Sequence, residues 1–266
     1  MAILLNSKNI FMSTNWFGAF TLLKKEIYRF LKVYHQTIFS PVINIILFLA
    51  VFNLSVGNQI QTIEGVEFAV FMSAGLIMMA SLQNAFANSS SSFVMGKVMG
   101  HIVDYLLPPL GAFELLFAFT LGAIARGVLV GIVAYLTIWI FVPLGFHNFF
   151  IALFYLIMGC ALLGLLGILC GIISETFDHM SAMTSYVITP LTFLSGTIYS
   201  TNSLPPILQT ISHFNPFFYL IDGFRYGLTG HNDGSLIIGS IYIGFINLIL
   251  GLIIFILIKK GYKIKN

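Results

Sequence analysis

Charged residues are scarce in this sequence. Aspartate, glutamate, lysine and arginine make up only 8% of the 266 residues, whereas hydrophobic residues make up 58% and the mean hydropathy is +0.98. This composition excludes an ordinary soluble domain, because too few polar groups are present to cover a water-exposed surface. The sequence therefore predicts an integral membrane protein, and its net charge of +3 gives no indication of a nucleic-acid partner.

Sequence patterns of catalysis are also missing. No GxxxxGK[ST] phosphate loop occurs, because Gly96-Lys97 is followed by Val98 and lacks the upstream glycine. The six histidines show no HExxH spacing, and no GxSxG nucleophile motif is present. The two cysteines, Cys160 and Cys170, lie in one apolar run on different helical faces, which predicts buried, inert thiols. We therefore expect no catalytic residue, metal site or cofactor in this chain.

Long apolar runs dominate the sequence. A membrane-spanning helix needs about 20 apolar residues, and six runs come close to or exceed that length. They cover residues 38–56, 68–87, 121–142, 149–173, 183–199 and 236–258. The predicted fold class is an all-α integral membrane protein, in which residues 1–266 form a single transmembrane domain.

The positions of lysine and arginine predict the orientation of these spans. With the N-terminus inside, eleven of the twelve lie in the cytoplasm or, like Arg126, at the cytoplasmic boundary of a span, and only Arg225 lies outside. The sequence therefore predicts a multi-pass protein with both termini in the cytoplasm.

The cytoplasmic N-terminus, residues 1–37, contains an amphipathic pattern from Trp16 to Tyr34. Its apolar residues fall on one face, with Lys25, Arg29 and Lys32 opposite, which predicts an interfacial helix in contact with membrane lipids. Two interpretations remain open: a lipid anchor only, or an anchor in which Lys24, Lys25, Glu26 or Arg29 also contacts a cytosolic subunit.

Two cytoplasmic segments carry charges that suit a protein partner. In the region 88–120, a helix over residues 93–107 would place Lys97, His101 and Asp104 on one face, so it either docks into a partner or is a solvated surface helix. In the turn 174–179, Glu175 and Asp178 favour a protein contact, whereas capping of a helix by Ser174 or Thr176 is the alternative.

The apolar segment before the last span is broken. Polar residues interrupt it after Tyr199, and Pro205-Pro206 fits the first turn of a new helix. Asn215-Pro216 then ends that helix. The pattern predicts short re-entrant helices in an external region, residues 200–234, because broken backbone at membrane depth must be covered or reach water.

Several polar side chains have predicted partners. Asp222 and Arg225 are three residues apart, which predicts a structural ion pair, with a gate contact across a dimer as the alternative. Glu64 and Glu67 are expected to be solvated. We expect the polar residues of the spans to form hydrogen bonds between helices. The alternative is that they line a substrate path. These residues are Asn44, Asn53, Ser81, Gln83, Asn84, Thr189 and Thr192.

The order LTFLSGTIYS, LPP and HFNPFFYLIDGFRYGLTG resembles the region before the last span in membrane subunits of type-2 ATP-binding-cassette (ABC) exporters. It is similar in particular to bacterial drug and glycan export permeases, and the rest of the chain agrees from about Trp16 onward. The resemblance implies a permease of the bacterial inner membrane that moves an amphipathic, lipid-linked or drug-like substrate outward.

The resemblance also implies partners. Two copies of a cytosolic ATPase subunit would hold ATP and Mg, and a second permease chain would complete a homodimer or heterodimer. The helix at 93–107 would be the coupling helix, Glu114 and Arg126 would be charged positions around the entry to the third span, and Asn215 and Pro216 would belong to the external region.

Two other function classes remain. An ion-driven transporter or channel normally places ionisable groups deep in its spans, and the predicted spans hold none beyond Arg126. A membrane anchor of an ATPase complex that transports nothing is the second.

Overall fold

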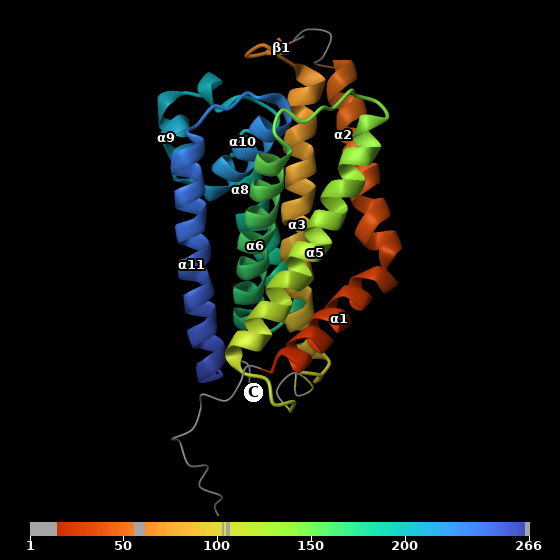
Figure 1. Cartoon of the computed structure of the whole chain (residues 1–266), viewed down its shortest axis with the longest axis vertical. Coiled ribbons are helices and arrows are strands. Elements are labelled where there is room, and N and C mark those ends of the chain that lie inside the picture. Colours follow the sequence, from red (N-terminus) through yellow and green to blue (C-terminus); the bar gives the residue numbers. More distant parts are fainter. Residues whose placement is uncertain (1–14, 56–61, 103, 105–106, 264–266) are drawn as a thin grey trace, which may run out of the picture.

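The computed structural model describes residues 15–55, 62–102, 104 and 107–263, in which helices are joined by loops and one short hairpin (Figure 1). The long helices are α2 (Ser40–Ser55), which continues a π-helical turn at His35–Phe39, and α3 (Phe68–Val98), α5 (Ala112–Trp139), α6 (Phe149–Ile173) and α11 (Leu236–Lys260). The remaining helices are α1 (Trp16–Lys32), α7 (Phe177–Met183), α8 (Thr189–Phe193), α9 (Pro206–Phe214) and α10 (Pro216–Thr229). Strands β1 (Thr62–Ile63) and β2 (Val66–Glu67) form the hairpin, with Ile63 opposite Val66.

Five of the six predicted spans are helices long and apolar enough to cross a membrane. The predicted fifth span, 183–199, differs from the structure. Its helix begins earlier, at Phe177, continues through a π-helical turn at Thr184–Ile188 and ends at Phe193. The earlier start has a local cause, because Thr176 Oγ1 accepts a hydrogen bond from the His179 N–H at 3.3 Å and caps the helix.

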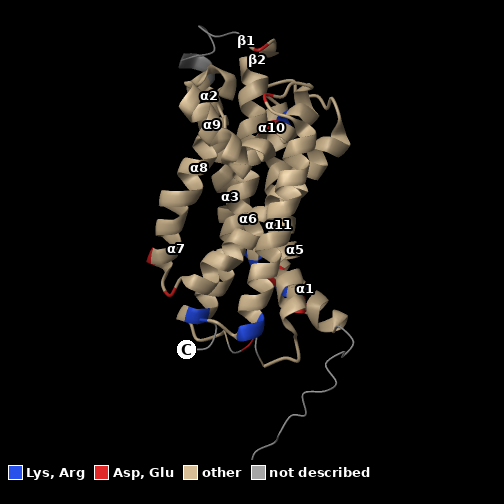
Figure 2. Ribbon diagram, turned by 90° about the vertical axis from the view of Figure 1, so that its left-hand side faces the viewer, with Lys and Arg blue, Asp and Glu red and all other residues tan. Residues whose placement is uncertain are grey.

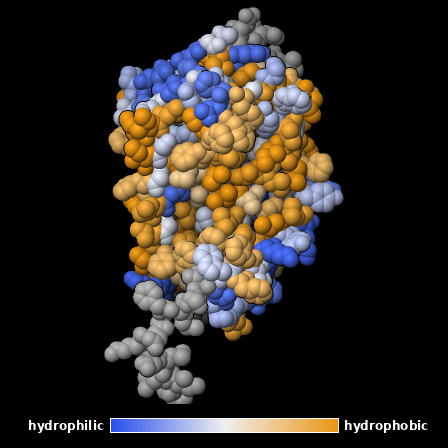
Figure 3. Space-filling model, viewed as in Figure 1, coloured by the Kyte–Doolittle hydropathy of each residue, from blue (hydrophilic) through white to orange (hydrophobic). Residues whose placement is uncertain are grey.

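Helices α3 and α6 form the centre of the bundle, with α5, α10 and α11 around them (Figure 1). Glycine allows the close approach: a Cβ on Gly167 of α6 would lie 2.5 Å from the Phe86 carbonyl oxygen of α3. Cys160 and Cys170 are buried in this core as free thiols, as predicted. Hydrophobic side chains cover much of the outer surface between more hydrophilic ends, as expected for a protein surrounded by lipid (Figure 3).

We name the two ends of the bundle by what they hold. The α1 end contains α1 and the C-terminal end of α11, and the hairpin end contains β1, β2 and α9 (Figure 1). Lysine and arginine gather mostly at the α1 end, which agrees with the asymmetry of the sequence (Figure 2).

Helix α1 packs on the bundle through a narrow seam. Ala19, Leu22, Glu26 and Phe30 are buried, and this spacing places them on the side that faces α3 and α5. Of the predicted apolar face, Trp16 and Phe20 remain about half exposed, at 47% and 55%. The helix is therefore amphipathic as predicted, but its buried seam contains a carboxylate.

A single helix over residues 93–107 is not present. Residues Phe93–Val98 are the end of the long helix α3, and residues 99–102 form a turn in which Gly100 has φ +72°. The Ile102 N–H donates to the Gly96 carbonyl at 2.8 Å, which is a glycine-dependent way of ending a helix. Residues 103, 105 and 106 lie outside the described part of the chain. The prediction of one helix was wrong because it treated Gly100 as a helical residue.

The break before the last span is confirmed. The chain leaves helical geometry after Phe193, and α9 begins at Pro206 with Pro205 before it. Asn215 separates α9 from α10, and Pro216 occupies the first turn of α10.

Candidate functional site

The exposed loops of the α1 end hold part of the predicted ATPase contact. His101 and Asp104 are both exposed and lie 3.7 Å apart. Glu175 and Asp178 are exposed in the turn at the start of α7, where Glu175 pairs with Lys263 at 3.2 Å. The capping alternative is confirmed for Thr176, while a contact of Glu175 and Asp178 with a partner stays a prediction.

Lys97 does not share an exposed face with His101 and Asp104, contrary to the prediction. Its Nζ donates to the carbonyl oxygen of Ile172, and to that of Ser174 at 3.2 Å. These carbonyls belong to the end of α6, where a cation satisfies acceptors that the helix leaves free. Lys97 therefore joins the end of α3 to the end of α6 and brings the two exposed loops together.

Glu26 and Arg29, predicted to contact a partner, are bound within the chain. Together with Asn88, Ser91 and Ser92 of α3 they form what we call the α1 latch. Arg29 Nη2 lies 3.0 Å from Glu26 Oε2, and the Glu26 side chain is fully buried. Arg29 also donates to the Asn88 carbonyl at 2.8 Å, and Ser92 Oγ donates to Glu26 Oε1 at 2.9 Å. A buried carboxylate needs such partners, so α1 is held to α3.

Glu114 extends this connection to α5. It lies in the first turn of α5, and its Oε1 accepts the backbone N–H of Asn15 at 3.0 Å. Asn15 in turn caps α1, because its Oδ1 accepts the Gly18 N–H at 2.9 Å. Glu114 is only 8% exposed, so it joins α1 to α5 and is not part of an open surface.

A cavity of ≈ 520 Å³ opens midway along the bundle between α2, α3 and α5. The π-helical turns His35–Phe39 and Thr184–Ile188 also contribute to its wall. Its polar lining includes Gln36, Asn44, Gln83, Asn84, Arg126, Thr184 and Thr189. Arg126 donates to Asn84 Oδ1 through Nε at 3.3 Å and Nη2 at 3.1 Å. A cation and several amides at this depth are costly against lipid, so the cavity requires water, substrate or another chain.

The polar residues of the spans divide into two groups. Ser81 and Thr192 donate to carbonyls of their own helices, at Ile77 and Ile188, so the predicted bonds between helices are wrong for them. Asn84 does connect two helices, through Arg126. Asn44, Gln83 and Thr189 line the cavity. The side chain of Asn53 lies outside the described part of the chain.

Asp222 and Arg225, at the hairpin end, do not form the predicted ion pair, although the structure describes both. Asp222 accepts the N–H groups of Asp233 at 2.8 Å and Gly234 at 2.9 Å. Arg225 donates to the Gly196 carbonyl at 2.6 Å, and its guanidinium carbon lies 3.7 Å from the centre of the Phe71 ring. Asp222 and Arg225 each bind a neighbouring segment of the chain. These contacts take the place of an ion pair between the two side chains on α10.

Asn215 bonds to the chain on both sides of the break, at the start of α10 and at the end of α8. Its Oδ1 caps α10 by accepting the Phe217 N–H at 3.1 Å, while its Nδ2 donates to the Leu191 carbonyl at 2.8 Å and to Ser195 Oγ at 2.9 Å. Asn215 and Pro216 thus fix the start of α10 against α8. A role of these residues in a gate stays a prediction.

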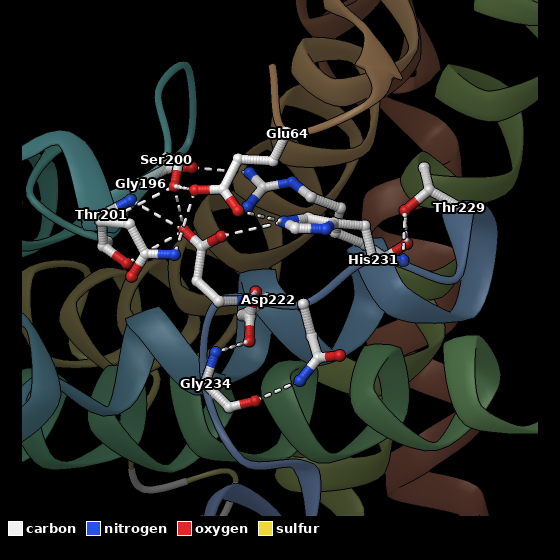
Figure 4. A network of polar contacts seen from close by, with 12 residues as sticks. Glu64, Gly196, Ser200, Thr201, Asp222, Thr229, His231 and Gly234 are labelled. Carbon is white, nitrogen blue, oxygen red and sulfur yellow. Dashed lines mark hydrogen bonds and ion pairs between the residues drawn. The ribbon is translucent and has the colours of Figure 1, made fainter. Parts of the chain in front are cut away.

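Asp233 contacts Ser200, Thr201 and His231 in a polar network at the hairpin end, and Figure 4 shows these three partners. Its Oδ2 accepts the Thr201 N–H at 2.8 Å and lies 2.9 Å from Ser200 Oγ, and its Oδ1 lies 3.1 Å from His231 Nε2. Burial alone would raise the pKa of Asp233, but hydrogen bonds from Thr201, His231 and Ser200 outweigh it and place the pKa below its usual range.

Glu64 joins the same network from the hairpin and is not merely solvated. Its Oε1 accepts from Asn202 Nδ2 at 3.1 Å and lies 3.1 Å from Ser200 Oγ, whose one proton it shares with Asp233 as alternative acceptor. Glu64 and Gly65 both have positive φ, 48° and 84°, as a two-residue hairpin turn requires. Sequence spacing alone did not identify this group, because Glu64 lies far from His231 and Asp233 along the chain.

The α1 latch gives a first prediction. Replacing Glu26 with alanine leaves Arg29 without its carboxylate, and breaking a buried ion pair from one side costs about 3–5 kcal/mol. We expect Glu26→Ala to lower the melting temperature of the purified protein clearly. The same substitution at the exposed Glu175 is the control and should change it little. Equal melting temperatures for the two variants would contradict the latch.

Comparison with known proteins gives the family. The profile of the ABC-2 type transporter family matches residues 18–229. The inner membrane transport permease YadH of Escherichia coli K12 is 37% identical over 226 residues, which cover 85% of this chain and 88% of YadH. Nodulation protein J of Rhizobium leguminosarum bv. trifolii is 28% identical over 185 residues, which cover 66% of this chain and 67% of that protein.

The match includes the broken segment before the last span, on which the sequence resemblance rests. Membrane permeases of this family lack an ATPase domain, in agreement with the missing phosphate loop. This chain therefore belongs to the ABC-2 type transporter family, as a membrane permease.

Proposed function

We propose that this chain is the membrane subunit of an ATP-driven exporter in the inner membrane of a bacterium. Family membership supports a separate ATPase subunit, and the name of YadH supports the inner membrane. The observation that carries the transport role is the cavity around Arg126, because it offers a polar path at membrane depth in an otherwise apolar bundle.

In this proposal the chain crosses the membrane six times, with both termini in the cytoplasm. The five long helices supply five crossings, and the helical stretch from Phe177 to Phe193 supplies the sixth. The gathering of lysine and arginine supports a cytoplasmic α1 end (Figure 2). The hairpin end, with the short helices α9 and α10, then faces outward as the re-entrant region.

A second copy of the chain would cover the cavity. The cavity opens beside α2, whose Leu47 is 57% exposed, and beside the π-helical turn Thr184–Ile188, whose Tyr186 is 81% exposed. Two such faces brought together would enclose a path lined by amides and Arg126 on one side and by Phe48 and Leu76 on another. This mixed lining suits an amphipathic, lipid-linked or drug-like substrate.

Energy would come from two cytosolic ATPase subunits, which hold ATP and Mg and dock on the exposed loops of the α1 end. His101, Asp104, Glu175 and Asp178 supply the charged contacts. Movement of these loops would reach the cavity through Lys97 and the α1 latch, because both join the α1 end to α3.

The other function classes have less support. An ion-driven transporter needs ionisable groups within its spans, and in the described spanning helices Arg126 is the ionisable group that faces the central cavity. A membrane anchor without transport would bind an ATPase but would not need a polar path.

Docking on the loops gives a second prediction. A tagged chain purified from its native membrane in mild detergent should retain an ATPase subunit. The variants His101→Ala/Asp104→Ala and Glu175→Ala/Asp178→Ala should each retain at least about tenfold less, which corresponds to about 1.4 kcal/mol. The matched control is His147→Ala/Glu67→Ala at the hairpin end. Undiminished retention by both loop variants would contradict the docking site.

The covered cavity gives a third prediction. Because both native thiols are buried, a cysteine introduced at an exposed position becomes the reactive one. Leu47→Cys on α2 should form a cross-linked dimer in native membranes on oxidation. Leu248→Cys on α11, which is 62% exposed, is the control and should stay monomeric. If Leu248→Cys formed the cross-linked dimer and Leu47→Cys did not, the second copy would lie against α11 and not against α2, which would contradict the proposal.

A further inference from the structure

Glu64, His231 and Asp233 bring one possible metal-ligand atom each close together at the hairpin end, where Figure 4 shows Glu64 and His231. His231 Nε2 lies 3.1 Å from Asp233 Oδ1 and 3.7 Å from Glu64 Oε2. All three atoms lie within 4.8 Å of one another. Around a tetrahedral metal ion with bonds of about 2.0–2.1 Å, neighbouring ligand atoms are about 3.3 Å apart. The two distances from His231 are close to this spacing, and a movement of Glu64 toward His231 and Asp233 would close the three atoms on an ion.

The other oxygen of each carboxylate is already occupied. Asp233 Oδ2 accepts from the Thr201 N–H, and Glu64 Oε1 accepts from Asn202 Nδ2. Ser200 Oγ lies within hydrogen-bond distance of both oxygens and donates its one proton to either of them. These bonds leave Oδ1 and Oε2 facing the His231 ring. Outer hydrogen bonds that fix ligand orientation in this way are a general feature of metal sites.

The backbone of the ligand-bearing loop is fixed as well. Asp222 accepts the N–H groups of Asp233 and Gly234, and the His231 N–H donates to Thr229 Oγ1 at 3.2 Å. The arrangement of His231 and Asp233 is thus built by α10 and does not depend on a bound ion.

Charge and ligand type indicate the class of ion. Two carboxylates and a neutral imidazole carry two negative charges, which a divalent cation neutralises. Imidazole is a favoured ligand of Zn²⁺ and related transition metals, whereas Mg²⁺ and Ca²⁺ prefer oxygen alone. The site is open to solvent, because the Glu64 side chain is 38% exposed and that of His231 is 20% exposed.

We propose that Glu64, His231 and Asp233 bind one divalent transition-metal ion of the Zn²⁺ class, with water at the fourth position. The ion joins the β1–β2 hairpin to the loop before α11. Through Ser200 and Thr201 it also fixes the turn after α8, which borders a cavity of ≈ 460 Å³ lined by Glu64, Ser200 and Tyr199. The site stabilises the arrangement of these segments. Its existence does not depend on the transported substrate.

The test is Zn²⁺ binding to the chain purified in detergent. The chain is purified with an affinity tag that contains no histidine, so that the tag itself binds no Zn²⁺. After treatment with EDTA and removal of the chelator, Zn²⁺ is added, and binding is measured by titration and by metal analysis after gel filtration. The wild type should bind about one Zn²⁺ per chain and gain melting temperature. His231→Gln and Glu64→Gln should each weaken binding at least about tenfold. Glu67→Gln, two residues along the hairpin from its Gly65 turn, is the matched control and should bind like wild type.

Glu64 is on the exposed hairpin, so Glu64→Gln tests the site even if His231→Gln unfolds. Melting in EDTA shows whether each variant is folded without metal. A wild type that binds no Zn²⁺, or a folded Glu64→Gln variant that binds it as tightly as wild type, would overturn the proposal. In either case the cluster would be a network of hydrogen bonds only. Equal affinity for Mg²⁺ would show that an ion binds but would contradict the proposed class of ion.

Discussion

A charged group inside an apolar bundle has to find a partner within the chain, and this constraint shapes the whole molecule. Arg29 binds Glu26 and Asn88, Lys97 binds the end of α6, and Arg225 binds the Gly196 carbonyl. The bonds from Arg29 to Asn88, from Lys97 to the end of α6 and from Arg225 to Gly196 join segments that are far apart in the sequence. These three cations therefore connect separate segments of the bundle, because leaving them unpaired against lipid would be too costly.

Helix α3 is the element that these connections share. It begins beside the β1–β2 hairpin, passes the cavity around Arg126, and ends at Lys97 beside the exposed loops. The α1 latch holds α1 to the same helix. In the proposed exporter, movement of the exposed loops would be transmitted to the cavity by α3 and α1, which move as one unit. The α1 latch joins these two helices, and Lys97 joins α3 to the end of α6 beside the loops.

The sequence predicted the elements whose signals are local. Apolar runs identified five long helices, and Pro205-Pro206 and Asn215-Pro216 identified the broken segment. The pairings of charged residues were harder. From the sequence, Glu26 and Arg29 are available to a cytosolic subunit, but α3 packs against them and binds both. Asp222 and Arg225 are spaced as partners, but neighbouring segments supply other partners for each. Gly100 is a local signal for the end of a helix, and the prediction of one helix over residues 93–107 did not use it. The cluster of Glu64, His231 and Asp233 had no local signal, because the fold alone brings the hairpin to that loop.

The most direct test of the proposed mechanism is the distance between the two copies of α2 during the ATP cycle. Spin labels on Leu47→Cys in both copies would be measured by pulsed electron resonance in nanodiscs that contain the permease with its ATPase. The account predicts that the distance distribution shifts when ATP and Mg²⁺ are added, because closure of the ATPase subunits moves α1, α3 and the cavity together. An unchanged distribution in a complex that hydrolyses ATP would contradict it.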